Sequence, residues 1–253
     1  DDGSAATTLL TALPGTPNVA DVTYAAQNIY PLESTNSSTV TSLRMLIQTA
    51  NNQYKLRGLF PTGWSISGNN PGEQLQIDIT YGISWWDYAS ETFPNATATD
   101  AKDGTICGNG SMFYNDVGTS TRQTSSLRSW SISGSMETTP LLGPDAVNTY
   151  QNIVGARRVR NAVTFTTMHD AEAAGTTTWG DIFDAGTLQH ILIGCSVADG
   201  KAVGFYFPNA EMTSRPTQEG SDGLNRVTCQ WRALTGTDTA SEREMASFTI
   251  GMG

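Results

Sequence analysis

The sequence predicts a mainly β protein whose short strands are joined by many turns, and three observations lead to this fold class. The chain of 253 residues is rich in Thr, Ser and Gly, and only 15% of its residues are charged, so it has little material for surface helices. Several segments alternate apolar and polar residues, which is the period of a strand with one buried face. Clusters of Gly, Pro and Asn separate these segments.

The clearest element is a hairpin between residues 64 and 81. Its first strand is Trp-Ser-Ile-Ser-Gly at 64–68, and Asn69-Asn70-Pro71-Gly72 is turn chemistry. The second strand carries polar residues in alternation with apolar ones, so one face is expected to be wet and the other packed. The polar residues are Gln74, Gln76, Asp78 and Thr80, and the apolar ones are Leu75, Ile77, Ile79 and Tyr81.

Similar alternation predicts the other strands. Leu43, Met45 and Ile47 define a strand with one buried face, and a strand follows at 54–60. Further strands are expected at 111–114, 130–134, 162–167, 188–195, 201–208, 226–233 and, at a sheet edge, 248–250. Residues 86–126 are otherwise expected to be loop, and helical turns are expected at 144–147 and 179–183.

The expected organisation is an N-terminal arm at 1–35 and two β-units at 36–127 and 128–253. The second unit contains a long excursion at 135–160 that we expect to contact a partner. The order Leu46-Ile47, Phe60-Pro61 and 75–81 returns as Leu192-Ile193, Phe207-Pro208 and 224–231, with similar spacing. This echo is compatible with an internally duplicated β-unit or with chance and shared strand periodicity.

Charge and composition exclude several classes of protein. The formal net charge is -10 and the pI is about 4.5, so no basic surface is expected to wrap nucleic acid. No apolar run approaches the roughly 20 residues that span a bilayer. The three cysteines are far apart and fit neither a disulfide framework nor a metal knuckle, so buried free thiols are expected.

No catalytic motif is present. His169 and His190 show no metal-ligand spacing and are expected to be structural. No nucleophile elbow, phosphate loop or dinucleotide fingerprint occurs. Carboxylate pairs for glycosidic chemistry depend on the fold, and the candidates are Glu73, Asp78, Asp87, Glu91, Glu219 and Asp222. We therefore expect no catalytic residues, no metal site and no cofactor, and the protein is predicted not to be an enzyme.

One basic cluster, Arg157, Arg158 and Arg160, ends the excursion at 135–160. It is interpreted as a charged strand edge or as an interface with carboxylates of a partner. Its position at the end of the excursion favours the interface.

Three strand-turn-strand stretches occur in a fixed order, at 56–81, 130–167 and 204–233. In this order they resemble the tail tube (major tail) proteins of long-tailed, non-contractile bacteriophages, over roughly residues 40–250. The resemblance implies two packed antiparallel sheets with a short flanking helix. It implies rings of six copies, or of three where the tube domain is duplicated, in which one sheet of each copy joins a lumen barrel.

The resemblance also implies function and partners. The rings stack into a tube in the virion tail, after synthesis in the host cytoplasm, and an acidic lumen conducts viral DNA without holding it. Further implied partners are a tape-measure protein and the tail tip and terminator proteins. The lumen-facing candidates are Gln74, Gln76, Asp78 and Thr80. The inter-subunit candidates are Pro144, Asp145, Arg157, Arg158 and Arg160, and the N-terminal arm is also expected to contact neighbouring rings.

Two other interpretations share the composition. A virion decoration or coat-associated β-protein would assemble on a capsid lattice. A secreted carbohydrate-binding or glycosidic β-sandwich would expose Trp residues as a stacking platform. Trp64, Trp130 and Trp231 fall on apolar strand faces, which favours burial in the core.

Overall fold

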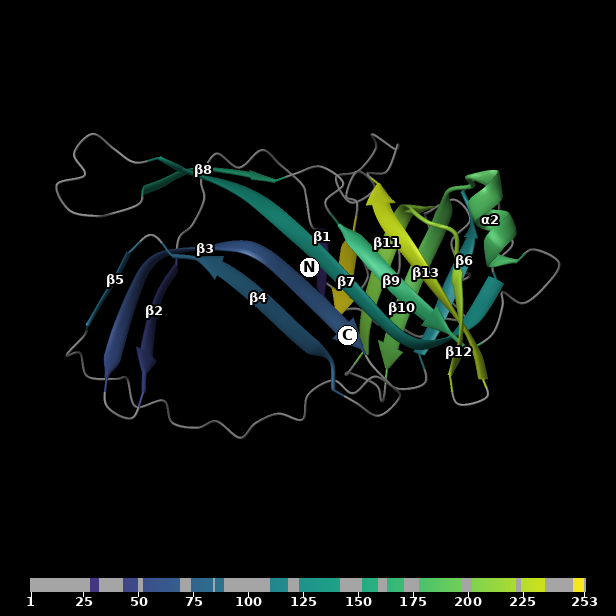
Figure 1. Ribbon diagram of the computed structural model, residues 1–253, viewed down its shortest axis with the longest axis horizontal. Helices are drawn as coiled ribbons and strands as arrows, with labels where there is room; N and C mark the ends of the chain where they lie inside the picture. Colours follow the sequence, from purple (N-terminus) through teal and green to yellow (C-terminus); the bar gives the residue numbers. More distant parts are fainter. Residues whose placement is uncertain are drawn as a thin grey trace.

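The structure is a computed structural model (Figure 1). It describes residues 28–31, 43–49, 52–68, 74–83, 85–88, 110–117, 123–141, 152–158, 163–170, 178–196, 202–221, 224–234 and 248–252. These residues lie mostly in antiparallel strands, and one short helix, α2 (Trp179–Ala185), occurs among them. The prediction of a mainly β fold with two packed sheets and a short helix is confirmed.

Six antiparallel strands form the body of the molecule. In pairing order they are β6 (Gly110–Asp116), β7 (Gln123–Leu141), β9 (Thr164–His169), β13 (Leu224–Leu234), β11 (Ala202–Met212) and β10 (Gln189–Ser196). Because β10 also pairs with β6, the two packed sheets share their border strands and the body is barrel-like.

Three short strands extend the body. β12 (Thr217–Ser221) pairs with β13, and β14 (Thr249–Met252) lies between β11 and β1 (Asn28–Pro31). The prediction that 248–250 is an edge strand is therefore wrong. A segment of the predicted N-terminal arm, 28–31, forms β1 and covers that edge.

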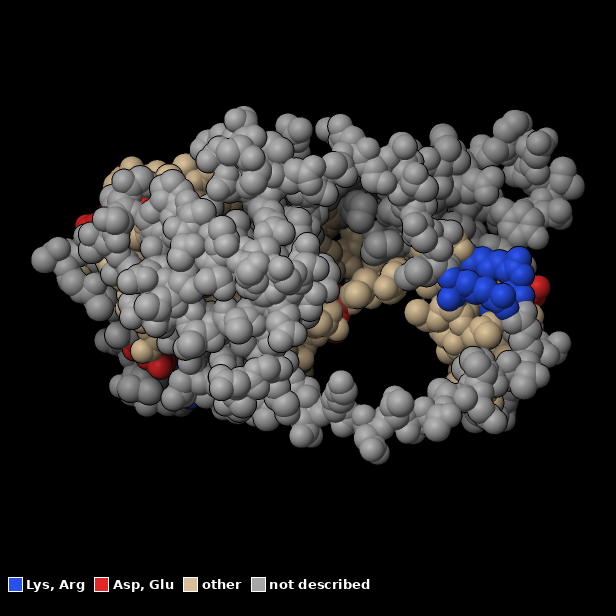
Figure 2. Space-filling model, turned by 180° about the vertical axis from the view of Figure 1, so that it is seen from behind, with Lys and Arg blue, Asp and Glu red and all other residues tan. Residues whose placement is uncertain are grey.

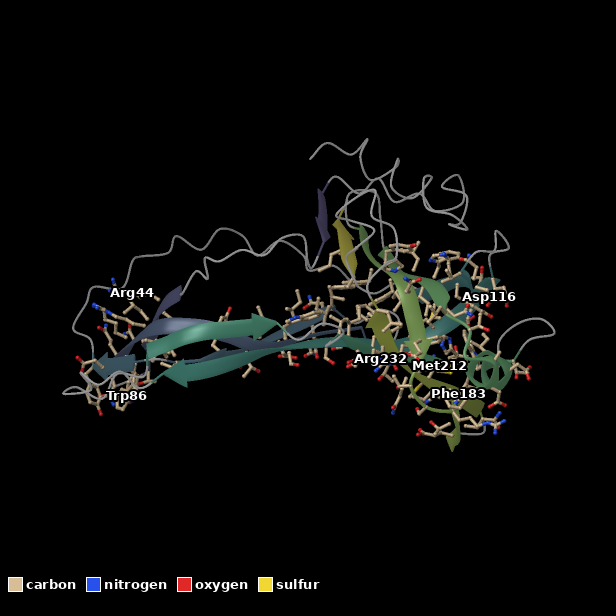
Figure 3. The ribbon with its side chains drawn as sticks, turned by 90° about the horizontal axis from the view of Figure 1, so that it is seen from above. Arg44, Trp86, Asp116, Phe183, Met212 and Arg232 are labelled. Carbon is tan, nitrogen blue, oxygen red and sulfur yellow. The ribbon has the colours of Figure 1, made fainter. Side chains whose placement is uncertain are left out.

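Two long strands leave the body and build an arm, which Figures 1 and 3 show projecting to one side. They are β3 (Gln53–Gly68) and the C-terminal part of β7. β2 (Leu43–Gln48), β4 (Gln76–Gly82) and β5 (Trp85–Tyr88) pair with β3, and β8 (Asn152–Arg158) pairs with β7. We call these six elements the arm.

The bounds of the strands correct the two segments that were expected to be loops. The expected excursion at 135–160 is partly a hairpin, because β7 continues to Leu141 and pairs with β8 from Met136↔Arg158 to Leu141↔Asn152. The expected loop at 86–126 contains most of β5 and the start of β7, and the strand expected within it at 111–114 is present as β6. The expected boundary between residues 127 and 128 falls inside β7. The expected helical turn at 144–147 lies outside the described residues, and the helical turn at 179–183 is confirmed as α2.

The repeated sequence Trp-Ser-Ile-Ser-Gly has a direct structural cause. Residues 64–68 of β3 pair antiparallel with 130–134 of β7, with Ile66 opposite Ile132 at the centre. Each Trp therefore lies opposite the Gly of the other copy. The ring of Trp64 covers Gly134 so closely that a Cβ there would lie 2.6 Å from it. The repeat is a cross-strand pattern in which large and small residues complement each other.

β3 contains two bulges, and together they keep the apolar residues at both ends of the strand on one side of the sheet. Gly58, with φ of 63°, is an extra residue in the pairing with β2, and Thr62 is an extra residue in the pairing with β4. The Thr62 hydroxyl donates to the carbonyl oxygen of Thr80 at 3.3 Å. Each bulge reverses the side to which the following residues point, and two reversals cancel. Tyr54 and Leu56 therefore lie on the same face as Trp64 and Ile66.

That shared face becomes the core inside the body. Its largest buried side chains are aromatic, and Phe165 stacks on Phe207 with ring centroids 4.0 Å apart. The helix α2 closes one end, where buried Trp179 contacts Tyr114 and His169. Thr178 and Asp181 form a capping box at the start of the helix. The expected burial of Trp130 and Trp231 is confirmed, and Trp64 packs against the core while partly exposed.

Candidate assembly surfaces

The first surface is a polar sheet face that crosses five strands, from β4 through β3, β7 and β9 to β13. Residues directly opposite each other in an antiparallel pair share a face. One cross-strand row therefore contains Asp78, Ser65, Ser133, Thr164 and Arg232. We call this surface the polar face.

A second row runs parallel to the first. It contains Gln76, Ser67, Ser131, Thr166 and Gln230, and none of them is apolar. The opposite side of β3, β7, β9 and β13 contributes Ile66, Ile132, Phe165 and Trp231 to the core, and that of β4 carries Ile77 and Ile79. Hence these five strands have one polar and one apolar side.

The polar face places three of the four lumen-facing candidates together. Gln76, Asp78 and Thr80 are exposed on β4 and point to this side, beside the serines of β3, and Gln74 is exposed just before the strand. The Ser133 and Thr164 hydroxyls are 3.2 Å apart, and Arg232 donates to Glu211 at 2.5 Å. The face is thus rich in hydroxyls and amides and carries little charge.

The second surface is the apolar side of the arm, where a sequence prediction fails. Ile77 and Ile79 were expected to be packed, but they are 60% and 48% exposed. Met45 and Ile47, expected on a buried face of β2, are exposed as well. The alternation predicted the correct strands, but these four side chains on the apolar side of the arm are exposed, whereas Leu56 of β3 on the same side is buried. We call this surface the apolar arm face.

An aromatic cluster lies on the apolar arm face near its tip. Tyr54 of β3 faces Tyr88 and Trp86 of β5, with ring centroids 5.5 and 6.2 Å away. Trp86 is 56% and Tyr88 is 64% exposed. Trp86 and Tyr88 lie in the segment 86–126, for which the sequence predicted a loop, so the cluster was not predicted. The alternation of Trp86, Asp87 and Tyr88 could have predicted this strand, with both aromatic side chains on one side.

Basic side chains lie on the opposite side of the arm tip. Arg44 is directly across from Arg57, and Lys55 is across from Asp87. Figure 2 shows the Lys and Arg atoms gathered at this end, and Figure 3 shows Arg44 and Trp86 on opposite sides of the arm. These basic residues are separated in the chain and come together only through strand pairing, so the sequence did not predict the group.

Two of the predicted inter-subunit residues, Arg157 and Arg158, belong to β8 in the β7–β8 hairpin. The backbone of Arg157 pairs with Glu137 and that of Arg158 with Met136. Pro144, Asp145 and Arg160 lie outside the described residues. The structure therefore places two of the five candidates on the arm.

Inside the body, His169 takes part in a buried hydrogen-bond chain. Its Nδ1 is 2.9 Å from Ser125 Oγ, its Nε2 is 2.9 Å from Thr167 Oγ1, and Trp231 Nε1 donates to the same Thr167 oxygen. A neutral imidazole satisfies both contacts, and burial lowers the pKa of His169 to about 4. Burial also lowers the pKa of His190, which contacts Tyr206 at 3.3 Å. These contacts agree with the expected structural roles of both histidines.

The described part of the chain contains no group of His, Cys, Asp or Glu suited to a metal ion. It also contains no helix long and apolar enough to cross a membrane. Cys229 is a buried free thiol, as expected.

A comparison with protein-family models and a comparison with curated proteins each found no match to this chain.

Proposed function

We propose that this protein is a structural virion protein that polymerises as stacked rings into a phage tail tube, whose lumen conducts DNA during ejection. The observation that carries the proposal is the pair of opposite sheet faces. One strand layer is polar from β4 to β13, and its other side continues from the core onto an arm that exposes apolar residues. A sheet of this kind suits a wall that faces water on one side and protein on the other.

The arm supports assembly from identical copies. Within the described residues, β4 pairs only with β3, so its outer edge is available for another strand. Exposed edges and apolar strands are hazards in a monomer, but in a ring the neighbouring copies complete them. The N-terminal segment and the β7–β8 hairpin are proposed to contact neighbouring rings.

The polar face is proposed to line the bore. β4, β9 and β3 from Gly58 onward contain no Lys or Arg, and Arg232 of β13, the cation in the two polar rows, donates to Glu211. Because tight DNA binding depends on cations that displace phosphate counterions, such a wall lets a duplex pass. Asp78 adds negative charge at β4, and the net charge of -10 per copy adds repulsion at longer range.

Negative-stain electron microscopy of the purified full-length protein tests the proposal. We expect hollow rods of constant width, and a reconstruction should place Asp78 on the inner wall. Particles that bind only to capsids would favour a decoration protein instead. Single chains at high concentration, with no rods and no rings, would contradict the proposed function.

A further inference from the structure

We infer that the apolar arm face docks onto a second copy of this chain, at the end of its body that carries α2. This contact is head-to-tail, with the arm of one copy on the body of the next. The inference rests on the proposed self-assembly, and it names the surfaces that meet.

The exposed apolar area is concentrated on the arm. Eight large apolar side chains are exposed in the described part of the chain, and seven of them lie on β2, β4 and β5 or directly after β4. They are Met45, Ile47, Ile77, Ile79, Ile83, Trp86 and Tyr88. By typical side-chain areas they expose together on the order of 600–700 Å² of apolar surface along the length of the arm, whereas the largest single patch of an ordinary monomer is about 300–600 Å². This approaches the roughly 800 Å² that each partner contributes to a stable interface.

The eighth exposed apolar side chain identifies the complementary surface. Val117 follows β6, at the end of the body that α2 closes. Its backbone nitrogen donates to the carbonyl oxygen of Leu188, directly after the helix. The only large apolar side chain exposed outside the arm, among the described residues, therefore lies at the opposite end of the molecule (Figure 1).

Charge favours the same pairing. The end with α2 carries the carboxylates of Asp116, Asp170, Asp181 and Asp184, and Arg215 pairs with Asp184 at 3.1 Å. The arm tip carries Arg44, Lys55 and Arg57. Two copies with a net charge of -10 repel each other in most orientations, so an approach with the basic tip first is favoured.

The two faces of the arm argue against nucleic acid as the occupant. A single-stranded nucleic acid needs aromatic rings and cations on one surface, because its bases stack while its phosphates bind. Here Trp86 and Tyr88 lie on one side of the sheet, and Arg44 and Arg57 on the other. A protein surface fits this arrangement better, because the apolar side can be buried while the basic side stays in water.

The contact joins surfaces at opposite ends of the molecule (Figure 1), and it is heterologous when the arm of each copy reaches on to a further copy. A heterologous contact repeats from copy to copy, and it produces a closed ring or an open filament. It thus predicts assembly without a stable two-fold dimer.

Cysteine crosslinking of the full-length protein tests the contact directly. Two variants, Tyr88→Cys and Val117→Cys, are made in a parent with Cys107→Ser and Cys195→Ser, then mixed and treated with a short bis-maleimide. Crosslinked dimers are expected in the mixture and not in either variant alone. Gln48→Cys is the matched control, because it lies at the arm tip on the other side of β2, and it should not crosslink to Val117→Cys.

A second variant measures the affinity. Trp86→Ala should weaken self-association about 30-fold, as expected for loss of a central aromatic anchor of about 2 kcal/mol. The melting temperature of the monomer should change little, because Trp86 is mostly exposed.

The outcomes separate this inference from the proposed function. Rods that form without the crosslink between positions 88 and 117 overturn the head-to-tail contact and leave the tube proposal standing. Dimers from Tyr88→Cys alone overturn it in favour of an arm-to-arm contact. Trp86-dependent binding to glycans, without self-association, contradicts both.

Discussion

Gly134→Ala is expected to destabilise the fold, and the structure gives the magnitude. A Cβ on Gly134 would lie 2.6 Å from Cε2 and Nε1 of the Trp64 ring, which is inside van der Waals contact. The ring cannot move freely, because it stacks on Phe248 with centroids 5.8 Å apart. Overpacking of this kind costs about 1–3 kcal/mol, and the loss of glycine flexibility in the unfolded chain offsets about 0.4–1 kcal/mol. We expect a net loss of about 1–2 kcal/mol.

Thermal unfolding followed by Trp fluorescence checks this value. For a chain of this size the loss corresponds to a decrease in Tm of roughly 2–8 °C. Gly63→Ala is the matched control: Gly63 lies next to Trp64 in β3, and a Cβ there would meet only the Gly134 carbonyl oxygen at 3.6 Å. If both variants melt alike, or if Gly134→Ala melts above the parent, the close Trp-Gly pairing is refuted.

Three further outcomes are expected. The pKa of His169 is about 4 in the folded protein and 6.5 in the unfolded chain, so the unfolded state binds more protons between these values. Stability should therefore fall by up to about 3 kcal/mol as the pH decreases from 6.5 to 4, and a pH series of melts should lose this component in His169→Gln. Thr178→Ala removes the capping interaction with Asp181 and should cost about 1 kcal/mol in chemical denaturation, while Thr178→Ser should cost much less. Ile79→Thr should leave the monomer melt within about 0.5 kcal/mol of the parent but reduce self-association in sedimentation, and a large loss of monomer stability would show that Ile79 is buried in the single chain.

The sequence predicted the strands of the body well, because alternation and burial agree there. Residues 226–233 illustrate this: Val227, Cys229 and Trp231 are buried in β13, while Gln230 and Arg232 are exposed. The hairpin predicted at 64–81 is likewise present, as the antiparallel pair of β3 and β4. A short alternation of apolar and polar residues is enough to predict a strand and its buried side where a second layer covers the apolar side.

The same reasoning could not predict the arm. Ile77 and Ile79 have the alternation of a half-buried strand, but alternation does not reveal whether a second layer exists. The prolines and glycines in the excursion at 135–160 indicated a loop, whereas pairing with β8 extends β7 to Leu141. The polar face could not be assembled from the sequence either, because its rows join residues as distant as Asp78 and Arg232 through strand order alone. For the lumen-facing candidates, the spacing predicted only that their side chains share one exposed side of a strand.

The two bulges of β3 determine which of its side chains lie on the apolar arm face. Each inserted residue reverses the side to which the following side chains point. With only one of the two bulges, at Gly58 or at Thr62, Tyr54 and Leu56 would point to the side opposite that of Trp64 and Ile66. With both bulges, Tyr54 and Leu56 near the tip lie on the same side of β3 as Ile66 in the core. An arm that only needed to be soluble would gain nothing from this continuity and would tend to aggregate. The register therefore supports an arm whose apolar side is covered in the working state, and a copy of the same chain supplies a cover at fixed stoichiometry.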